Sequence, residues 1–168
     1  LSEDNNWKLN LTTGLYYKIP TYTALGFKDI NDNFSNTNLL YTKSNHYVIG
    51  IEYNTSYSSR FTIESFLKKY NNYPISVLDN VSLANKGADF EVLGNELLLS
   101  VGKGKSYGIE FLYQQKLQNN FYGIFSYTFF FSEFSNLDNI YLPSVWDNRH
   151  LISFTGGYKL KKNWEISS

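Results

Sequence analysis

The segment Trp146-Asp147-Asn148-Arg149-His150 holds the densest group of chemically reactive side chains in the sequence. Asp147 and His150 are residue types that cooperate in hydrolases, where the pair activates a serine hydroxyl. No serine stands in a nucleophile-elbow context, which is a sharp turn between a strand and a helix. We therefore expect this segment to be structural, with Trp146 as an anchor and with Asp147 and Arg149 bonding to adjacent strands.

Gly104-Lys105-Ser106 resembles the end of a phosphate-binding loop. That pattern requires another glycine five positions before Gly104, where Leu99 stands, and it must open a helix. An alternating, strand-like segment follows instead. The sequence thus favours a flexible loop that enters a strand, in which the glycines relieve crowding.

Charged side chains recur at even positions in three alternating segments, which places them on one side of a sheet. The polar candidates for this side are Glu52, Glu64, Lys68, Glu110 and Arg149. Nothing fixes the separation of the glutamates or shifts a pKa, so they are not a convincing acid/base pair. The chain has two histidines and no cysteine, too few for a metal site without several carboxylates. We expect no catalytic residue, cofactor or metal, and hence no enzyme.

The composition favours strands, with 15 Tyr, 13 Phe and 3 Trp but only 3 Pro. Lys and Arg equal Asp and Glu at 15 each, so no overall field attracts nucleic acid. The most apolar run, from 122 to 131, is far shorter than the ~20 residues of a membrane-spanning helix. No secretion signal opens the sequence, and it stops inside a predicted strand; we therefore expect an internal fragment.

Period-two alternation predicts six strands of about ten residues and the start of a seventh at Trp164. The strands cover 7–18, 46–55, 60–70, 106–115, 121–131 and 149–160. Their connections alternate between short and long. The short ones are 56–59, 116–120 and 161–163, and the long ones are 19–45, 71–105 and 132–148, which predicts a meander with every long loop at one end.

The two faces of the predicted sheet differ in polarity. One face is apolar and carries Ile49, Ile109 and Phe111, with Lys69 as its only formal charge. The other face carries the charged candidates and glycines such as Gly50 and Gly108, which indicate bends or close approach. Aromatic residues mark the short-turn end of the apolar face: Trp7, Tyr53, Phe61, Tyr113, Phe121, Tyr158 and Trp164.

An aromatic belt at fixed depth is typical of a barrel that meets a membrane interface, and Trp146 would anchor the opposite rim. Strands of about ten residues also match a tilted membrane strand better than a typical soluble one. A soluble β-sandwich would bury the same apolar face against a second sheet, so this alternative stays open.

Several segments in succession carry a resemblance to a known family. They are 102–112, 120–128, Trp146-Asp-Asn-Arg-His150 and Gly156-Gly-Tyr-Lys159, preceded by Gly50-Ile-Glu-Tyr and by 64–70 with Pro74. Together they resemble the C-terminal barrel of TonB-dependent outer-membrane receptors, over roughly 46–166. The resemblance implies an all-β, up-and-down transmembrane barrel of 22 strands, of which residues 1–168 form a partial barrel domain of about seven strands without a plug.

The resemblance also implies a location in the bacterial outer membrane and a set of partners. The partners are membrane lipid, the remaining strands and plug of the parent protein, the TonB complex through that plug, and a surface lipoprotein. The leading hypothesis is an importer of a nutrient such as a siderophore, oligosaccharide or peptide. The alternatives are a soluble β-sandwich module that binds carbohydrate through loop tyrosines, and an outer-membrane barrel enzyme, which lacks a nucleophile and base.

Overall fold

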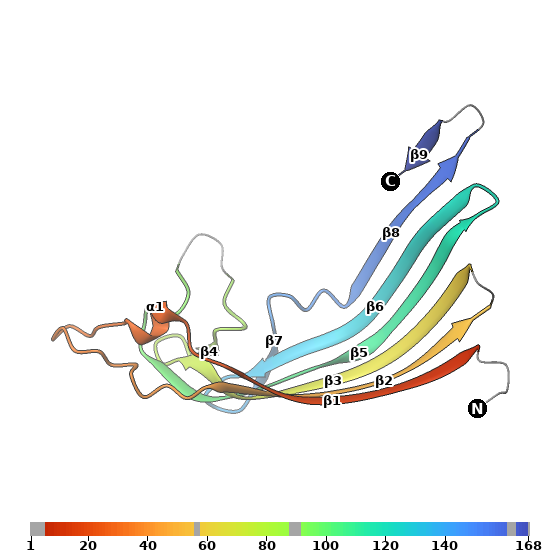
Figure 1. Cartoon of the computed structure of the whole chain (residues 1–168). Coiled ribbons are helices and arrows are strands. Elements are labelled where there is room, and N and C mark those ends of the chain that lie inside the picture. Colours follow the sequence, from red (N-terminus) through yellow and green to blue (C-terminus); the bar gives the residue numbers. More distant parts are fainter. Residues whose placement is uncertain (1–5, 56–57, 88–91, 161–163, 168) are drawn as a thin grey trace.

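A single antiparallel sheet contains all the strands in the computed structural model, which describes residues 6–55, 58–87, 92–160 and 164–167. The main strands follow one another in the order β1-β2-β3-β5-β6-β8-β9, with β4 added to β3 and β7 added to β6 (Figure 1). The elements are β1 Trp7–Lys18, α1 Tyr22–Leu25, β2 Thr42–Asn54, β3 Ser59–Ser76, β4 Val81–Ser82, β5 Leu98–Gln118, β6 Phe121–Ser135, β7 Tyr141–Pro143, β8 His150–Lys159 and β9 Glu165–Ser167. The predicted all-β antiparallel meander of about seven strands is confirmed, with six long strands and a short seventh, β9, among the described residues.

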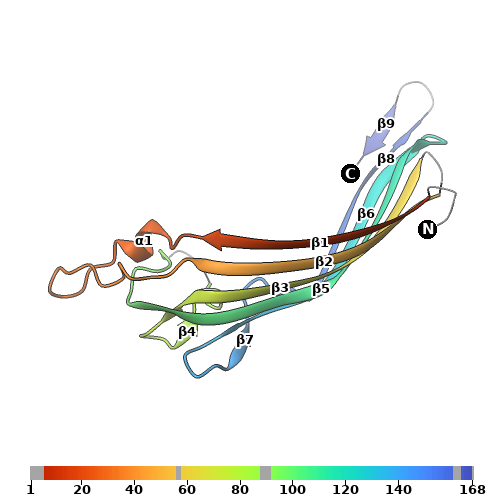
Figure 2. The same cartoon turned by 60° about the horizontal axis from the view of Figure 1, so that its bottom comes forward.

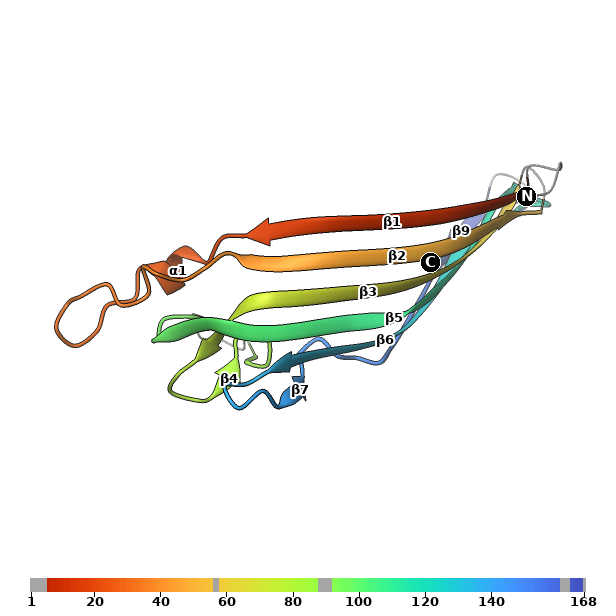
Figure 3. The same ribbon diagram turned by 90° about the horizontal axis from the view of Figure 1, so that it is seen from below.

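The sheet is a curved strip whose strands lie side by side along most of their length (Figures 2 and 3). All the long connections and α1 lie at one end of the strip, and the short turns lie at the other (Figure 1). The turn between β5 and β6 is a tight two-residue turn. Asn119 and Asn120 have φ angles of 49° and 68°, the left-handed values of a type I′ hairpin turn, which matches the twist of the strands.

Two strands extend well beyond their predicted ends. β3 continues to Ser76 past an irregularity between Tyr70 and Tyr73, where Asn72 has a φ of 56°. β5 begins at Leu98 rather than Ser106, so the glycine-rich stretch predicted as a loop lies inside a strand. A bulge inserts an extra residue and breaks the period-two pattern, which explains why the alternation appeared to stop at Tyr70.

The small buried core lies among the long connections rather than over the middle of the sheet. Its apolar members among the described residues are Ala24, Ile75, Ala84, Leu98 and Phe134. Asn36 links two connections there: its side-chain amide donates to the carbonyls of Ala24 at 2.9 Å and Glu96 at 2.7 Å, and its Oδ1 accepts from the Leu98 amide at 3.0 Å. A fully buried amide with all three bonds made fixes the loops to each other.

No second sheet packs on this strip in the described part of the chain, since every named strand belongs to the one sheet. A sandwich requires two sheets with interdigitating side chains about 10 Å apart. The β-sandwich alternative therefore lacks the layer it needs. Among the described residues, no helix is both long and apolar enough to cross a membrane.

Candidate functional site

The convex face of the sheet is an uncovered apolar surface. Strand register aligns one residue from each of six strands into a transverse row: Leu9, Ile51, Ile63, Phe111, Tyr127 and Ile152. Leu9, Ile63 and Ile152 are 62%, 55% and 70% exposed. Large apolar side chains this exposed over so wide a surface indicate a face that meets an apolar environment outside the chain.

A second transverse row lies nearer the short turns and is entirely aromatic. It consists of Trp7, Tyr53, Phe61, Tyr113, Phe125 and Phe154. Ring centres lie 4.3 Å apart for Trp7 and Tyr53, and 4.7 Å apart for Phe61 and Tyr113. Four of the seven predicted belt residues thus share one level, because register brings them together. Phe125 and Phe154, which were not among the predicted belt residues, belong to the same row.

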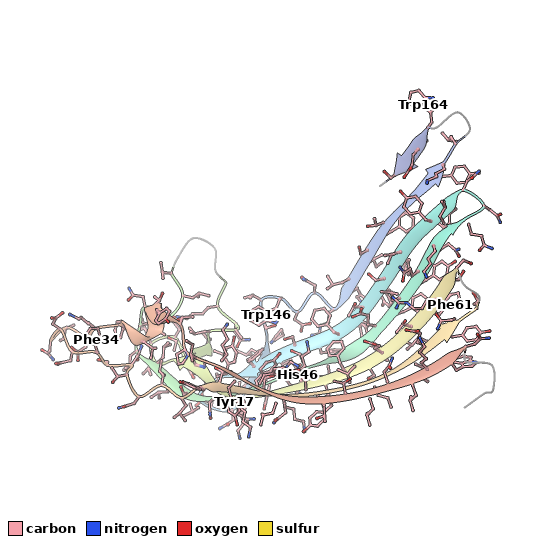
Figure 4. The ribbon with its side chains drawn as sticks, viewed as in Figure 1. Tyr17, Phe34, His46, Phe61, Trp146 and Trp164 are labelled. Atoms are coloured by element: carbon pink, nitrogen blue, oxygen red, sulfur yellow. The ribbon has the colours of Figure 1, made fainter. Side chains whose placement is uncertain are left out.

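The other three predicted belt residues lie closer to the turns. Phe121 pairs with Tyr158, four residues beyond the aromatic row along β6. Trp164 is 72% exposed beside the last short turn, where its carbonyl accepts a 2.7 Å bond from the Leu160 amide. Figure 4 places Trp164 and Phe61 toward the turn end of the sheet and Tyr17 toward the loop end. The role of these residues at an interface stays a prediction.

The concave face holds a charged cluster near the short turns. Glu52 accepts from Lys8 at 3.1 Å and from the Asn54 amide at 3.0 Å, and Arg60 lies 3.7 Å away. The predicted polar candidate Glu52 thus has two cationic neighbours, Lys8 and Arg60. A hollow of about 200 Å³ opens beside them, also lined by Gln114 and Lys116. These side chains form a polar surface.

Glu64 and Glu110 lie directly opposite each other on β3 and β5. Both line a second hollow of about 170 Å³, and neither forms an ion pair within the described ranges. Like charges directly opposite each other in a sheet are unfavourable. Gly50 leaves room for the Glu64 side chain, because a Cβ at position 50 would come within 2.8 Å of Glu64 Cγ. The pair thus presents unneutralised negative charge to the concave side.

Of the two remaining polar candidates, Lys68 shares the face of Glu64 on β3, whereas Arg149 does not lie on that face. Lys68 does not reach a glutamate; its Nζ lies 5.4 Å from the centre of the Phe66 ring. Arg149 pairs with Asp147 at 3.2 Å, and its guanidinium lies 4.2 Å from the centre of the Phe131 ring. Phe131 is on the convex face, next to Tyr107. Arg149 therefore lies beside the convex face, not on the concave one where it was expected.

The residues considered for catalysis do not assemble into a reactive group. His150 Nδ1 bonds to the Tyr127 hydroxyl at 2.8 Å, while the Asp147 carboxylate pairs with Arg149 instead. Ser106, between Gly104 and Gly108, lies inside β5 and exchanges a 2.8 Å bond with Ser132. Across the described part of the chain, no three metal-binding side chains converge.

A chain of rings crosses the concave face at the loop end. Its members are Tyr16, His46, Tyr70, Tyr73, Phe134 and Trp146, and successive ring centres are 4.5–6.4 Å apart. Trp146 donates to Ser132 Oγ at 3.1 Å and lies on the concave side of the sheet (Figure 4). Trp146 was expected to anchor the outer rim of the apolar face, so its position on the concave side is a correction. Even-numbered rings near the loop ends of the strands, at positions 16, 46, 70 and 134, were a signal in the sequence for part of this cluster. Tyr73 has an odd number because the register shifts between Tyr70 and Tyr73.

Comparison with solved structures places this sheet among known folds. The ferric-catecholate import receptor Fiu from Escherichia coli K12 matches with a TM-score of 0.68 and 14% identity, over 99% of this chain and 22% of that one. The pyoverdine outer membrane receptor FpvA from Pseudomonas aeruginosa PAO1 matches with a TM-score of 0.62 and 15% identity, over 94% and 21%. The chain has the fold of an outer-membrane receptor barrel wall.

The receptor-barrel fold also appears in a third structure. The alcaligin outer membrane receptor FauA from Bordetella pertussis has a TM-score of 0.59 and 12% identity, over 95% of this chain and 25% of that one. The chain thus spans about a fifth to a quarter of these receptors. The sequence matches no protein-family model and no curated protein. In a barrel of this fold, the convex face points outward and the concave face points into the interior.

Proposed function

We propose that the chain is part of the barrel wall of a TonB-dependent receptor that imports a nutrient ligand across the bacterial outer membrane. The apolar transverse row across six strands carries this proposal. That row has no protein layer over it in the described residues, and it lies beside an aromatic row, the arrangement that a lipid bilayer stabilises. The similar solved structures are named as receptors rather than enzymes, which supports a transport role.

The remaining barrel strands and the plug domain would come from the rest of the parent protein. A closed barrel needs further strands against the open edges of β1 and β9, since an unpaired edge leaves backbone groups unsatisfied in lipid. A plug bearing arginine or lysine would neutralise Glu64 and Glu110 on the concave side, and contact with the TonB complex would run through that plug. A surface lipoprotein partner is a further prediction.

Among the nutrient classes, a siderophore has the best support. The three similar structures are named for a ferric catecholate, for pyoverdine and for alcaligin. The rings on the concave face at the loop end are consistent with a planar ligand, since the Tyr16 and Trp146 side chains there are 54% and 45% exposed. An oligosaccharide or peptide ligand would need a different set of polar contacts from the loops.

An arginine scan of the two faces tests whether lipid covers the convex one. Ile109 is an exposed convex residue midway between the two ends of the sheet, and Gln114 lies on the concave side of the same strand. Ile109→Arg in the full-length protein should lower the free energy of unfolding from bilayers by about 2–4 kcal/mol. Gln114→Arg should have a much smaller effect, because the interior is hydrated.

Denaturant titration of the protein refolded into vesicles gives both values, with the unmodified protein as reference. Equal losses at the two positions would contradict the assignment of the faces. Uptake of radioactive ferric siderophore by cells that lack or carry the gene then tests the ligand class. Unchanged uptake with intact membrane insertion would reject the siderophore while leaving the barrel in place.

A further inference from the structure

Four lysines gather on the convex face where the strands approach the long loops. Register places Lys69 of β3 directly opposite Lys105 of β5, and Lys43 of β2 directly opposite Asn71 of β3. Lys43 and Lys103 are therefore diagonal neighbours of Lys69, at the ~7–8 Å spacing of such positions. We call Lys43, Lys69, Lys103 and Lys105 the lysine cluster. Lys69 lies at its centre.

The lysine cluster is short of negative charge. Lys105 pairs with Glu133 at 3.0 Å, whereas Lys43, Lys69 and Lys103 form no ion pair within the described residues. Lys69 and Lys103 are exposed. Like charges directly opposite and diagonal to each other repel, so this arrangement is unfavourable unless an anion lies against it. The anion must come from outside the described part of the chain.

The position of the cluster identifies the surroundings from which that anion comes. Tyr107 and Phe131, stacked with ring centres 5.2 Å apart, lie one step from Lys105 and Glu133 toward the middle of the sheet, and Ile109 lies one step further. Along β5, from the middle outward, the convex face thus changes from aliphatic Ile109 to aromatic Tyr107 to cationic Lys105. This is the order of a membrane boundary, where aromatic rings lie at the headgroups and lysines extend beyond them.

We propose that the lysine cluster binds the phosphate groups of an anionic lipid headgroup in the leaflet at the loop end. The proposal rests on the proposed function, because only a membrane-spanning wall brings this face to lipid. Three lysine ammonium groups around Lys69 match a headgroup that bears more than one phosphate. The headgroup caps the apolar face at its upper boundary and holds the lipid against the barrel wall.

The test uses the full-length protein, purified and reconstituted in phosphatidylcholine vesicles that contain lipid A, a glycolipid with two phosphates. The variant Lys43→Gln/Lys69→Gln/Lys103→Gln removes the three lysines without an ion-pair partner. The matched control, Lys18→Gln/Lys116→Gln/Lys159→Gln, removes the same charge from exposed lysines elsewhere in the chain. Co-purified lipid A is quantified by native mass spectrometry, and folding is checked by resistance of the barrel to heat in detergent gels.

We expect about fivefold weaker lipid A binding for each lysine removed, and hence a loss on the order of a hundredfold for the triple variant. The control should bind as the unmodified protein does, and lipid A without its phosphates should bind neither. The proposal would be overturned if the triple variant and the control bound lipid A equally, or if binding did not depend on the phosphates. Displacement of lipid A by inorganic phosphate alone would also overturn it, because that result would indicate a site for the free ion. A variant that stays heat-resistant while keeping its lipid rejects the lipid site and leaves the proposed barrel standing.

Discussion

At the residue scale, glycines on the concave face make room for large neighbours. A Cβ on Gly104 would come within 2.4 Å of the Phe134 ring, and one on Gly108 would come within 2.6 Å of Phe130 Cβ. The rings therefore lie against the backbone of β5, and Phe134 reaches Tyr70 and Tyr73 on β3 at 5.2 and 4.5 Å. The absence of a side chain on Gly104 is what lets aromatic packing cross three strands.

Gly104→Ala should destabilise the protein by about 1–3 kcal/mol, because the added methyl group overpacks a site whose neighbour is only 1% exposed. Unfolding of the reconstituted full-length protein in denaturant measures this loss. Phe134→Leu provides the control, since a smaller side chain leaves room for the methyl. The double variant should lose less than the sum of the two single losses, and simple additivity would show that the two residues do not interact.

At the scale of a connecting segment, Lys86 holds the loop between β4 and β5. Its Nζ pairs with Asp79 and, at 2.5 Å, with Glu96, and the Glu96 carboxylate also accepts from Ser76. Burial opposes the charge on Lys86, but hydrogen bonds and attraction from Asp79 and Glu96 outweigh burial and raise its pKa above 10.5. The stabilisation is therefore complete below the ordinary lysine pKa and disappears only as pH rises through the raised value.

Lys86→Met should loosen this loop, because it leaves the carboxylates of Asp79 and Glu96 close together without a cation. Hydrogen exchange of the backbone amides in 77–87 and 92–97 should accelerate in the variant. In the unmodified protein, the opening free energy derived from that exchange should not change between neutral pH and pH 9. Lys28→Met is the matched control, since its partner Asp32 is 82% exposed and such pairs contribute little. Equal effects of the two substitutions would reject the role given to Lys86.

The strands show which parts of the fold a sequence can predict. Trp7–Lys18 was predicted with its observed bounds, because both faces of β1 alternate without interruption. The start of β5 was missed because Gly102 and Gly104 are typical of loops. Their reason for being glycine lies in other strands: a Cβ on Gly102 would come within 2.5 Å of the Tyr73 carbonyl. Contacts between distant segments determined this boundary, and a local pattern does not contain them.

At the scale of the whole molecule, the sheet has two open edges and an exposed apolar face. Unpaired edge strands and large apolar patches both promote aggregation. The 168-residue chain expressed alone should therefore form aggregates in aqueous buffer and disperse only in detergent, as measured by light scattering and sedimentation. A monodisperse monomer in detergent-free buffer would contradict the proposed membrane wall.

The candidate site was predicted more completely on the convex face than on the concave one. The distance of an aromatic residue from the short turns follows from the alternation and from the turn positions. The sequence could therefore group Trp7, Tyr53, Phe61 and Tyr113. Charge pairing depends on register and side-chain reach, which the sequence does not specify. Arg149 illustrates this limit of sequence-based prediction. It lies at the end of a loop with a φ of 59°, and its side chain lies over the Phe131 ring of the convex face.

The length of β5 has a consequence for how a solute first meets the protein. A tilted strand crosses a bilayer with about 9–11 residues, yet β5 has 21. The surplus is divided between the two ends of β5, and residues 98–102 lie on the loop side of Lys103 and Lys105. At ~3.3 Å per residue and a tilt of about 45°, this part of the strand reaches on the order of 12 Å beyond the proposed headgroup contact. In the proposed receptor, this extension of the sheet would hold the long loops above the headgroup layer, so that a large solute would reach them from open water.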